Sequence, residues 1–209
     1  MKKCGSQNIK LRQWYLSEND IEAFRQLVRR ADHSLTDGFF PECYSESCEY
    51  HWIKGMVDSL LWGDELHYAV EVEGKAVGCV NVSRCGGVYS RMGVLRLVLL
   101  PEMCGQGIGT QVVNQVAREA FLCYGYLSTS FERLHARVIG ENKAAERVLK
   151  KNGFVHEGTL QNAAVKNNRT YDMKVYGLVA PVSNDESNVP LPNDRAERIV
   201  NIHELLKQK

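Results

Sequence analysis

The feature that most constrains this chain is a glycine-rich turn between an apolar run and a strongly amphipathic segment. The apolar run 97–101 ends in proline, and Gly105, Gly107 and Gly109 then occupy alternate positions. Because glycine has no side chain, backbone N–H groups in such a turn can approach a ligand closely. The segment 107–124 predicts a helix, and the unpaired N–H groups and the dipole at a helix start favour an anion. The turn therefore predicts a diphosphate-binding site.

Two other phosphate-binding patterns do not fit this turn. A Walker loop requires Lys followed by Ser or Thr directly after its last glycine, and no such pair follows here. A dinucleotide fingerprint requires a third glycine where this chain has Thr110, and it belongs at the first strand of a βαβ unit. Several strands are expected before this turn, so a dinucleotide-binding oxidoreductase does not fit.

Hydrophobic periodicity predicts an α/β fold of the α+β type, with a mostly antiparallel sheet and a strand–helix–strand unit after Met92. The almost entirely apolar run Met92–Leu100 predicts a central strand that is covered on both faces. The expected strands are 8–14, 67–73, 76–83, 92–100, 132–139, 154–161 and 171–178. The expected helices are 18–31 after an N-cap at Ser17, 46–61, 107–124, and 142–152 with Asn142 as its N-cap.

Charge and cysteine content limit the partners and the cellular compartment that are expected for this chain. The formal net charge is +1, so no global field favours nucleic acid or a membrane as partner. No segment has the pattern of a secretory signal or the length of a membrane span, and the odd number of seven cysteines favours free thiols in a reducing cytoplasm. Cys43, Cys48 and His51 have metal-ligand chemistry, but their spacing is unusual for zinc, so no metal is expected.

The composition changes after Val179. Prolines among Ser, Asn and Asp predict a linker over residues 180–192, and residues 193–209 predict an amphipathic helix. A lone helix of this length is marginal in water, so it is expected to dock on its own domain or on a second copy in a homodimer. Residues 1–179 then form the main domain.

Two motifs, in the same order along the chain, resemble those of the GNAT acetyltransferases. The family carries [Arg/Gln]-x-x-Gly-x-[Gly/Ala] between a central strand and the following helix, and Cys104, Gly107 and Gly109 occupy those positions. The second half is similar to the RimJ/RimL-like branch, which acetylates protein N-termini. The matching residues there are Ala136, Val138, Asn142, Ala145, Gly153, Phe154, Glu157, Gly158, Asp172 and Tyr176.

The resemblance implies a sheet of about seven strands flanked by about four helices, with the predicted C-terminal helix outside the pattern. It also implies acetyl-coenzyme A as cosubstrate and an amine as acceptor, either a protein N-terminus or a small molecule. Backbone groups of Leu97, Val98 and Leu99 would bind the pantetheine arm, and Asn142 would bind it near the thioester. The diphosphate would lie on Cys104, Gly105, Gln106, Gly107, Ile108, Gly109 and Thr110.

The chain departs from the family pattern at several functional positions. Cys104 replaces Arg or Gln, which removes a strong hydrogen-bonding side chain. Leu149 replaces a Tyr acid, and Ala145 and Ala164 replace the Ser and Glu of RimL-type enzymes. The remaining candidates for catalysis are Glu157, Asp172, Tyr176, Tyr89 and His135, each of which also has a structural interpretation. Two hypotheses stay open, an N-acetyltransferase and a coenzyme A-binding module without turnover.

Overall fold

The computed structural model describes residues 8–30, 50–55, 58, 65–89, 91–122, 131–166 and 168–181. The predicted C-terminal helix, Cys43, Cys48 and most of the predicted helix 46–61 lie outside the described residues. Within the described ranges, no group of three or more His, Cys, Asp or Glu residues is arranged to hold a metal ion. None of the described helices is both long and apolar enough to cross a membrane.

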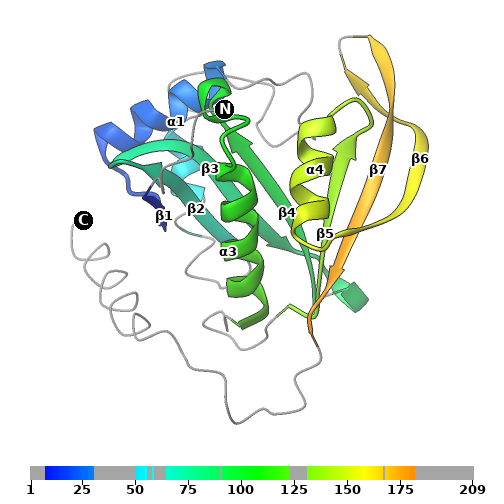
Figure 1. The fold of residues 1–209 in the computed structure, drawn as a ribbon. Coiled ribbons are helices and arrows are strands. Elements are labelled where there is room, and N and C mark those ends of the chain that lie inside the picture. The colour runs from blue at the N-terminus through cyan, green and yellow to red at the C-terminus, as the bar shows by residue number, and fades with distance from the viewer. Residues whose placement is uncertain are drawn as a thin grey trace.

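Seven strands form one sheet in the order β1-β2-β3-β4-β5-β7-β6 (Figure 1). Five of the neighbouring pairs are antiparallel, and only β4 and β5 run parallel. The predicted mixed and mostly antiparallel sheet is therefore confirmed. The strands are β1 (Ile9–Arg12), β2 (Glu65–Val72), β3 (Lys75–Arg84), β4 (Met92–Leu99), β5 (Arg133–Ile139), β6 (Val155–Lys166) and β7 (Arg169–Val179).

Two of the helices begin at residues whose side chains cap the first turn. The Ser17 hydroxyl accepts a hydrogen bond from the Asp20 N–H at 3.2 Å, and the Asn142 side chain accepts one from the Ala145 N–H at 3.0 Å. Both predicted N-caps are confirmed. The helices are α1 (Glu18–Arg30), α3 (Ile108–Leu122) and α4 (Lys143–Lys151), residues 50–55 are also helical, and Gly87–Tyr89 and Pro101–Met103 form 3-10 turns.

The predicted end of the strand 154–161 is wrong, because β6 continues to Lys166. The pairing of β6 with β7 shifts between Leu160 and Ala164, and Asn162 takes a positive φ of 52°. A bulge of this kind interrupts the alternation of side chains while the strand itself continues. The Asp172 carboxylate stabilises the bulge by accepting the Asn162 N–H at 2.9 Å.

The two faces of the sheet carry different layers. A Cβ placed on Gly109 of α3 would lie 3.5 Å from side-chain atoms of both Leu97 and Val148, so α3 and α4 cover the face to which Leu97 points. We call this the α3 face, and Figure 1 shows both helices in front of the sheet. Successive residues of a strand alternate between faces, so Arg96 and Val98 point to the opposite face. We call it the α1 face.

A buried carboxylate ties α4 to the sheet. Glu146 is 7% exposed, and it accepts hydrogen bonds from Lys174 Nζ at 2.7 Å, Lys143 Nζ at 3.0 Å and the Tyr176 hydroxyl at 3.2 Å. The hydrogen bond from Lys174, assisted by Lys143 and Tyr176, lowers the pKa of Glu146 to about 2. Since the folded state holds this proton more weakly than the unfolded state, the ionised carboxylate stabilises the fold.

We expect Glu146→Gln to lower the free energy of unfolding by about 1–3 kcal/mol at pH 7, because it leaves two lysines beside a neutral amide. The loss is fully present above the ordinary Glu pKa of 4.5 and shrinks as the pH falls toward about 2. Urea unfolding of both proteins between pH 7 and pH 3 measures this difference.

Glu141→Gln is the matched control, because Glu141 pairs with Arg169 and both side chains are more than half exposed. It is expected to change stability by less than about 1 kcal/mol. A Glu146→Gln difference that stays constant down to pH 3 would contradict the assigned role.

Candidate active site

The site begins where the two central strands separate. Strands β4 and β5 pair only from Met92 opposite Arg133 to Val94 opposite His135. Beyond Val94 they diverge, and a cavity of about 390 Å³ lies in the gap. Residues 95–99 of β4 line one side of it and residues 136–138 of β5 line the other. A volume of this size is typical of a small-molecule pocket.

The backbone of β4 turns one set of hydrogen-bonding groups toward this gap. The Leu100 N–H donates to the Val77 carbonyl at 2.9 Å, and the Met92 carbonyl accepts from the Cys85 N–H at 2.9 Å. Even-numbered residues of this segment therefore bond to β3, and the N–H and C=O groups of odd-numbered Leu95, Leu97 and Leu99 point away from it. They form a short strand edge that an extended amide-containing ligand can pair with.

The predicted glycine turn forms the second wall. Gly105 and Gly107 have φ values of 77° and 84°, and no protein atom would lie within 4 Å of a Cβ on either. The N–H groups of Thr110 and Gln111 donate to the Gly107 carbonyl at 3.1 and 3.2 Å. The N–H groups of Ile108 and Gly109 precede the first hydrogen bond within the helix, so no carbonyl of the helix can accept from them. The turn thus offers donors and open space, which suits a diphosphate.

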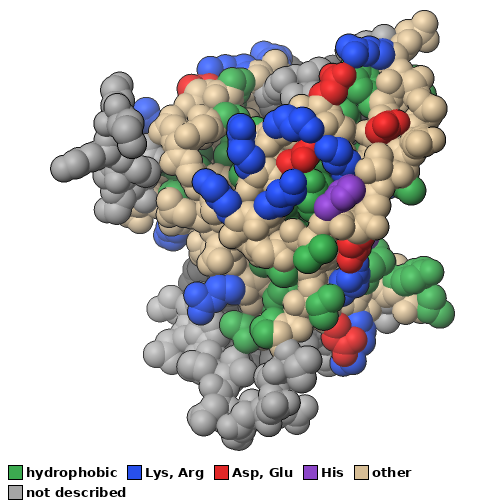
Figure 2. Space-filling view, turned by 45° about the vertical axis from the view of Figure 1, so that its right-hand side comes forward, with side chains coloured by type: hydrophobic (Ala, Val, Ile, Leu, Met, Phe, Trp, Pro, Cys, Tyr) green, Lys and Arg blue, Asp and Glu red, His purple; other side chains and the backbone are tan. Residues whose placement is uncertain are grey.

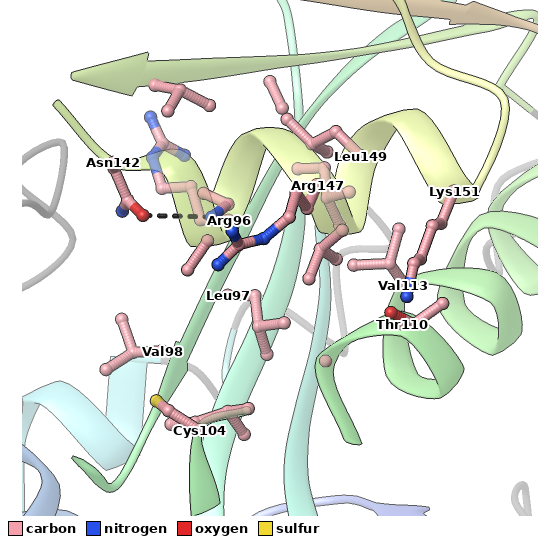
Figure 3. Close-up of a pocket in the computed structure, with 18 of the residues that line it drawn as sticks. Arg96, Leu97, Val98, Cys104, Thr110, Val113, Asn142, Arg147, Leu149 and Lys151 are labelled. Atoms are coloured by element: carbon pink, nitrogen blue, oxygen red, sulfur yellow. Dashed lines mark hydrogen bonds between the residues drawn. The ribbon is translucent and has the colours of Figure 1, made fainter. Parts of the chain in front are cut away.

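Helix α4 supplies the third wall and positive charge. Figure 3 shows Asn142 at its start and Lys151 at its end, with Lys151 beside Thr110 of α3. Arg147 and Lys151 are one helical turn apart, and both line the cavity. Figure 2 shows Lys and Arg side chains gathered on one face of the molecule. The end of the cavity beside Thr110 therefore combines a cationic side chain with backbone donors.

Most of the residues predicted to bind a cofactor meet at this cavity. Gln106 and Ile108 do not line it, since the Gln106 amide donates to the Glu102 carbonyl at 2.5 Å and the Ile108 side chain is fully buried in the core. The thiol of Cys104 donates to the Leu100 carbonyl with a separation of 3.6 Å. The residues that do line it are Leu97, Val98, Leu99, Cys104, Gly105, Gly107, Gly109, Thr110 and Asn142.

The candidates for catalysis lie elsewhere in the described part of the chain. Glu157 forms an ion pair with Arg133, and Asp172 stabilises the β6 bulge. Tyr176 is 1% exposed, and its hydroxyl donates to Glu146. Burial and the charge of Glu146 raise the pKa of Tyr176. No Asp, Glu, His or Tyr among the described residues lines the cavity.

Four cationic residues that line the cavity were not expected from the sequence, and Arg137 of β5 is one of them. Arg147 and Lys151 could have been found from their i, i+4 spacing on the predicted helix, on the side of Val148. Arg96 is the single charged residue within the apolar run Met92–Leu100. A charge in a central strand is costly to bury and in itself indicates a functional position.

Comparison with known proteins agrees with this geometry. Residues 8–155 match the model of the acetyltransferase (GNAT) domain. An 83-residue segment is 32% identical to the uncharacterized N-acetyltransferase YoaA of Bacillus subtilis, covering 40% of this chain and 44% of that protein. Spermidine N(1)-acetyltransferase of Escherichia coli is 26% identical over 159 residues, covering 76% of this chain and 78% of that enzyme.

Solved structures share the fold. The ribosomal-protein-S5-alanine acetyltransferase of Vibrio fischeri has a TM-score of 0.71 at 19% identity, covering 88% of this chain and 98% of its own. RimL, the ribosomal L7/L12 α-N-protein acetyltransferase, solved in complex with coenzyme A, has a TM-score of 0.68 at 16% identity, covering 84% and 96%. The predicted GNAT-like architecture is confirmed. The chain belongs to the acetyltransferase (GNAT) domain family, and its structural neighbours include members of the RimJ/RimL-like branch.

Proposed function

We propose that this chain binds acetyl-coenzyme A in the gap between β4 and β5 and transfers its acetyl group to a primary amine. The observation that carries the proposal is the continuity of the cavity from the strand edge at Leu95–Leu99 to the glycine turn at Gly105–Gly109. A pantetheine arm contains two amides that can pair with a strand edge, and the diphosphate that follows it suits the turn. The adjacent Arg147 and Lys151 suit the remaining phosphate charge.

In the reaction, the neutral amine nitrogen attacks the thioester carbonyl carbon, and an N–C bond forms as the C–S bond breaks. The nitrogen releases one proton to water, and the departing thiolate takes up one proton to give coenzyme A. A free α-amine with a pKa near 8 is roughly one-tenth neutral at pH 7, whereas less than about a thousandth of a lysine amine is neutral. Alignment of an α-amine beside the thioester therefore accounts for much of the rate.

The described cavity supplies positioning rather than an acid or base. The family's catalytic positions hold Leu149, Ala145 and Ala164, and the cavity lining described above has no Asp, Glu, His or Tyr. We therefore propose structural roles for Glu157, Asp172 and Tyr176, with proton removal by water. A coenzyme A-binding module without turnover is the alternative, and the same substitutions favour it.

Turnover separates these two functions. We expect thiol release from acetyl-coenzyme A in the presence of a panel of amino acids, N-terminal peptides and polyamines, at a rate above that of hydrolysis without acceptor. Detection of the free thiol measures the transfer, and mass spectrometry identifies the acetylated amine. Tight binding of acetyl-coenzyme A with no release across the panel would favour the module instead.

We expect Gly107→Glu to weaken acetyl-coenzyme A binding by about a hundredfold or more, because it places bulk and negative charge where the diphosphate is proposed to lie. Isothermal titration measures the Kd. Gly87→Glu is the matched control, since Gly87 also has a positive φ, of 63°, and no atom within 4 Å of a Cβ, but follows β3 at the opposite end of β4. Equal affinities of the two variants would contradict the placement of the diphosphate.

A further inference from the structure

The position of the cavity fixes the side from which an acceptor must come. Helices α3 and α4 cover the α3 face, where Leu97 meets Gly109 and Val148. Of the two faces, the α1 face is the one that these two helices do not cover, so we expect an amine to reach a thioester in the gap between β4 and β5 from there. The side chains that point to the α1 face beside this gap are the ones that can contact the acceptor.

Strand register places a polar group of side chains there. Arg96 of β4 is opposite Asn81 of β3, which is opposite His67 of β2. In the next row, Val94 is opposite Ser83, and Ser83 is opposite Glu65. Residues directly opposite in a ladder share a face, so these side chains form one continuous patch. We call Glu65, His67, Asn81, Ser83 and Arg96 the polar rows.

Glu65 is the carboxylate of the polar rows, and it already has hydrogen-bond partners within them. The Glu65 carboxylate contacts His67 Nε2 and accepts a hydrogen bond from Ser83. The hydrogen bond with His67 is the main cause that lowers the pKa of Glu65. Glu65 therefore stays ionised, and the charge of Arg96 contributes to this, although the two side chains form no ion pair.

Arg96 is the member of the polar rows that lines the cavity. Its Nη1 donates to the Ser83 hydroxyl at 3.2 Å, and no carboxylate of the described residues lies within ion-pair distance of its guanidinium. A guanidinium has five N–H donors in a planar fork, which fits a carboxylate in a bidentate geometry. Within the described part of the chain, this partly buried arginine uses one donor for a side-chain hydrogen bond, so its guanidinium is suited to receive an anionic group.

The anion is not a phosphate of the cosubstrate. Arg96 precedes Leu100 by four residues, which is about 13 Å of extended strand, and the glycine turn lies beyond Leu100. Lys151 lies beside Thr110, at the end of the cavity proposed to hold the diphosphate. Arg96 therefore serves the acceptor end of the cavity.

We propose that the acceptor is an amine that also carries a carboxylate, an α-amino acid being the smallest example, and that Arg96 binds this carboxylate from the α1 face. The proposal rests on the acetyl transfer proposed above and names its substrate class. The amine forms the new N–C bond and loses one proton to water, while the carboxylate stays bound and takes no part in bond breaking.

Two further observations support this substrate class. The Asn81 amide donates to Ser83 at 2.9 Å, and its buried Oδ1 has no hydrogen-bond partner among the described residues. This oxygen belongs to the residue opposite Arg96, so the polar rows also hold an acceptor that has no partner among the described residues. Burial, together with Arg137, Arg133 and Arg96, lowers the pKa of His135 at the point where β4 and β5 part. The field there is positive, which opposes a polyamine.

The test compares L-amino acids with their C-terminal amides, which keep the amine and lose the carboxylate, and with spermidine. We expect kcat/KM for the best amino acid to exceed that for its amide by at least about tenfold. Arg96→Gln should abolish this preference, mainly through a higher KM for the amino acid. Arg133→Gln is the matched control, because that arginine is on the same face but is already paired with Glu157.

Several results would overturn the proposal. Equal use of amides or spermidine by the unaltered protein contradicts it, and so does a carboxylate preference that survives Arg96→Gln. A panel in which no carboxylate-bearing amine is acetylated contradicts it as well. In each of these cases acetyl-coenzyme A binding still supports the cosubstrate site. Absence of that binding would instead contradict the proposed function itself.

Discussion

The site depends on the point at which the backbone pairing between strands β4 and β5 ends. Strands β4 and β5 are held together by three residue pairs from Met92 to Val94, and the next residues of β4 have no strand partner on that side. An unpaired strand edge inside a protein is costly unless a ligand or solvent satisfies it. The cavity follows from this divergence, and so does the exposure of the backbone groups of Leu95, Leu97 and Leu99 toward it.

The three elements around the gap supply different chemistry to one extended ligand. Strand β4 offers backbone pairing to an amide-containing arm, and the turn at Gly105–Gly109 offers N–H donors to an anion. Helix α4 adds Arg147 and Lys151 and is held to β7 by the ionised Glu146. One short helix thus carries both a structural ion network, through Glu146, and part of the cavity wall, through Arg147 and Lys151.

Local patterns were sufficient to predict most of the fold. The N-caps at Ser17 and Asn142 and the glycine turn before α3 follow from interactions within a few residues, and the structure confirms the caps. The end of β6 could not be predicted, because it depends on a bulge stabilised by Asp172 from the next strand. The position of Arg96 at the cavity was missed for a similar reason. Its neighbours Ser83 and Asn81 become adjacent only through strand register, which an apolar pattern does not encode.

The most direct test of this account is amide hydrogen exchange along β4, measured by NMR with and without acetyl-coenzyme A. Because even-numbered residues bond to β3, the amides of Arg96 and Val98 should be protected in both states. The amides of Leu97 and Leu99 point into the gap, and ligand binding should slow their exchange selectively. Unchanged exchange at these two amides under saturating ligand would contradict a cosubstrate bound along the β4 edge.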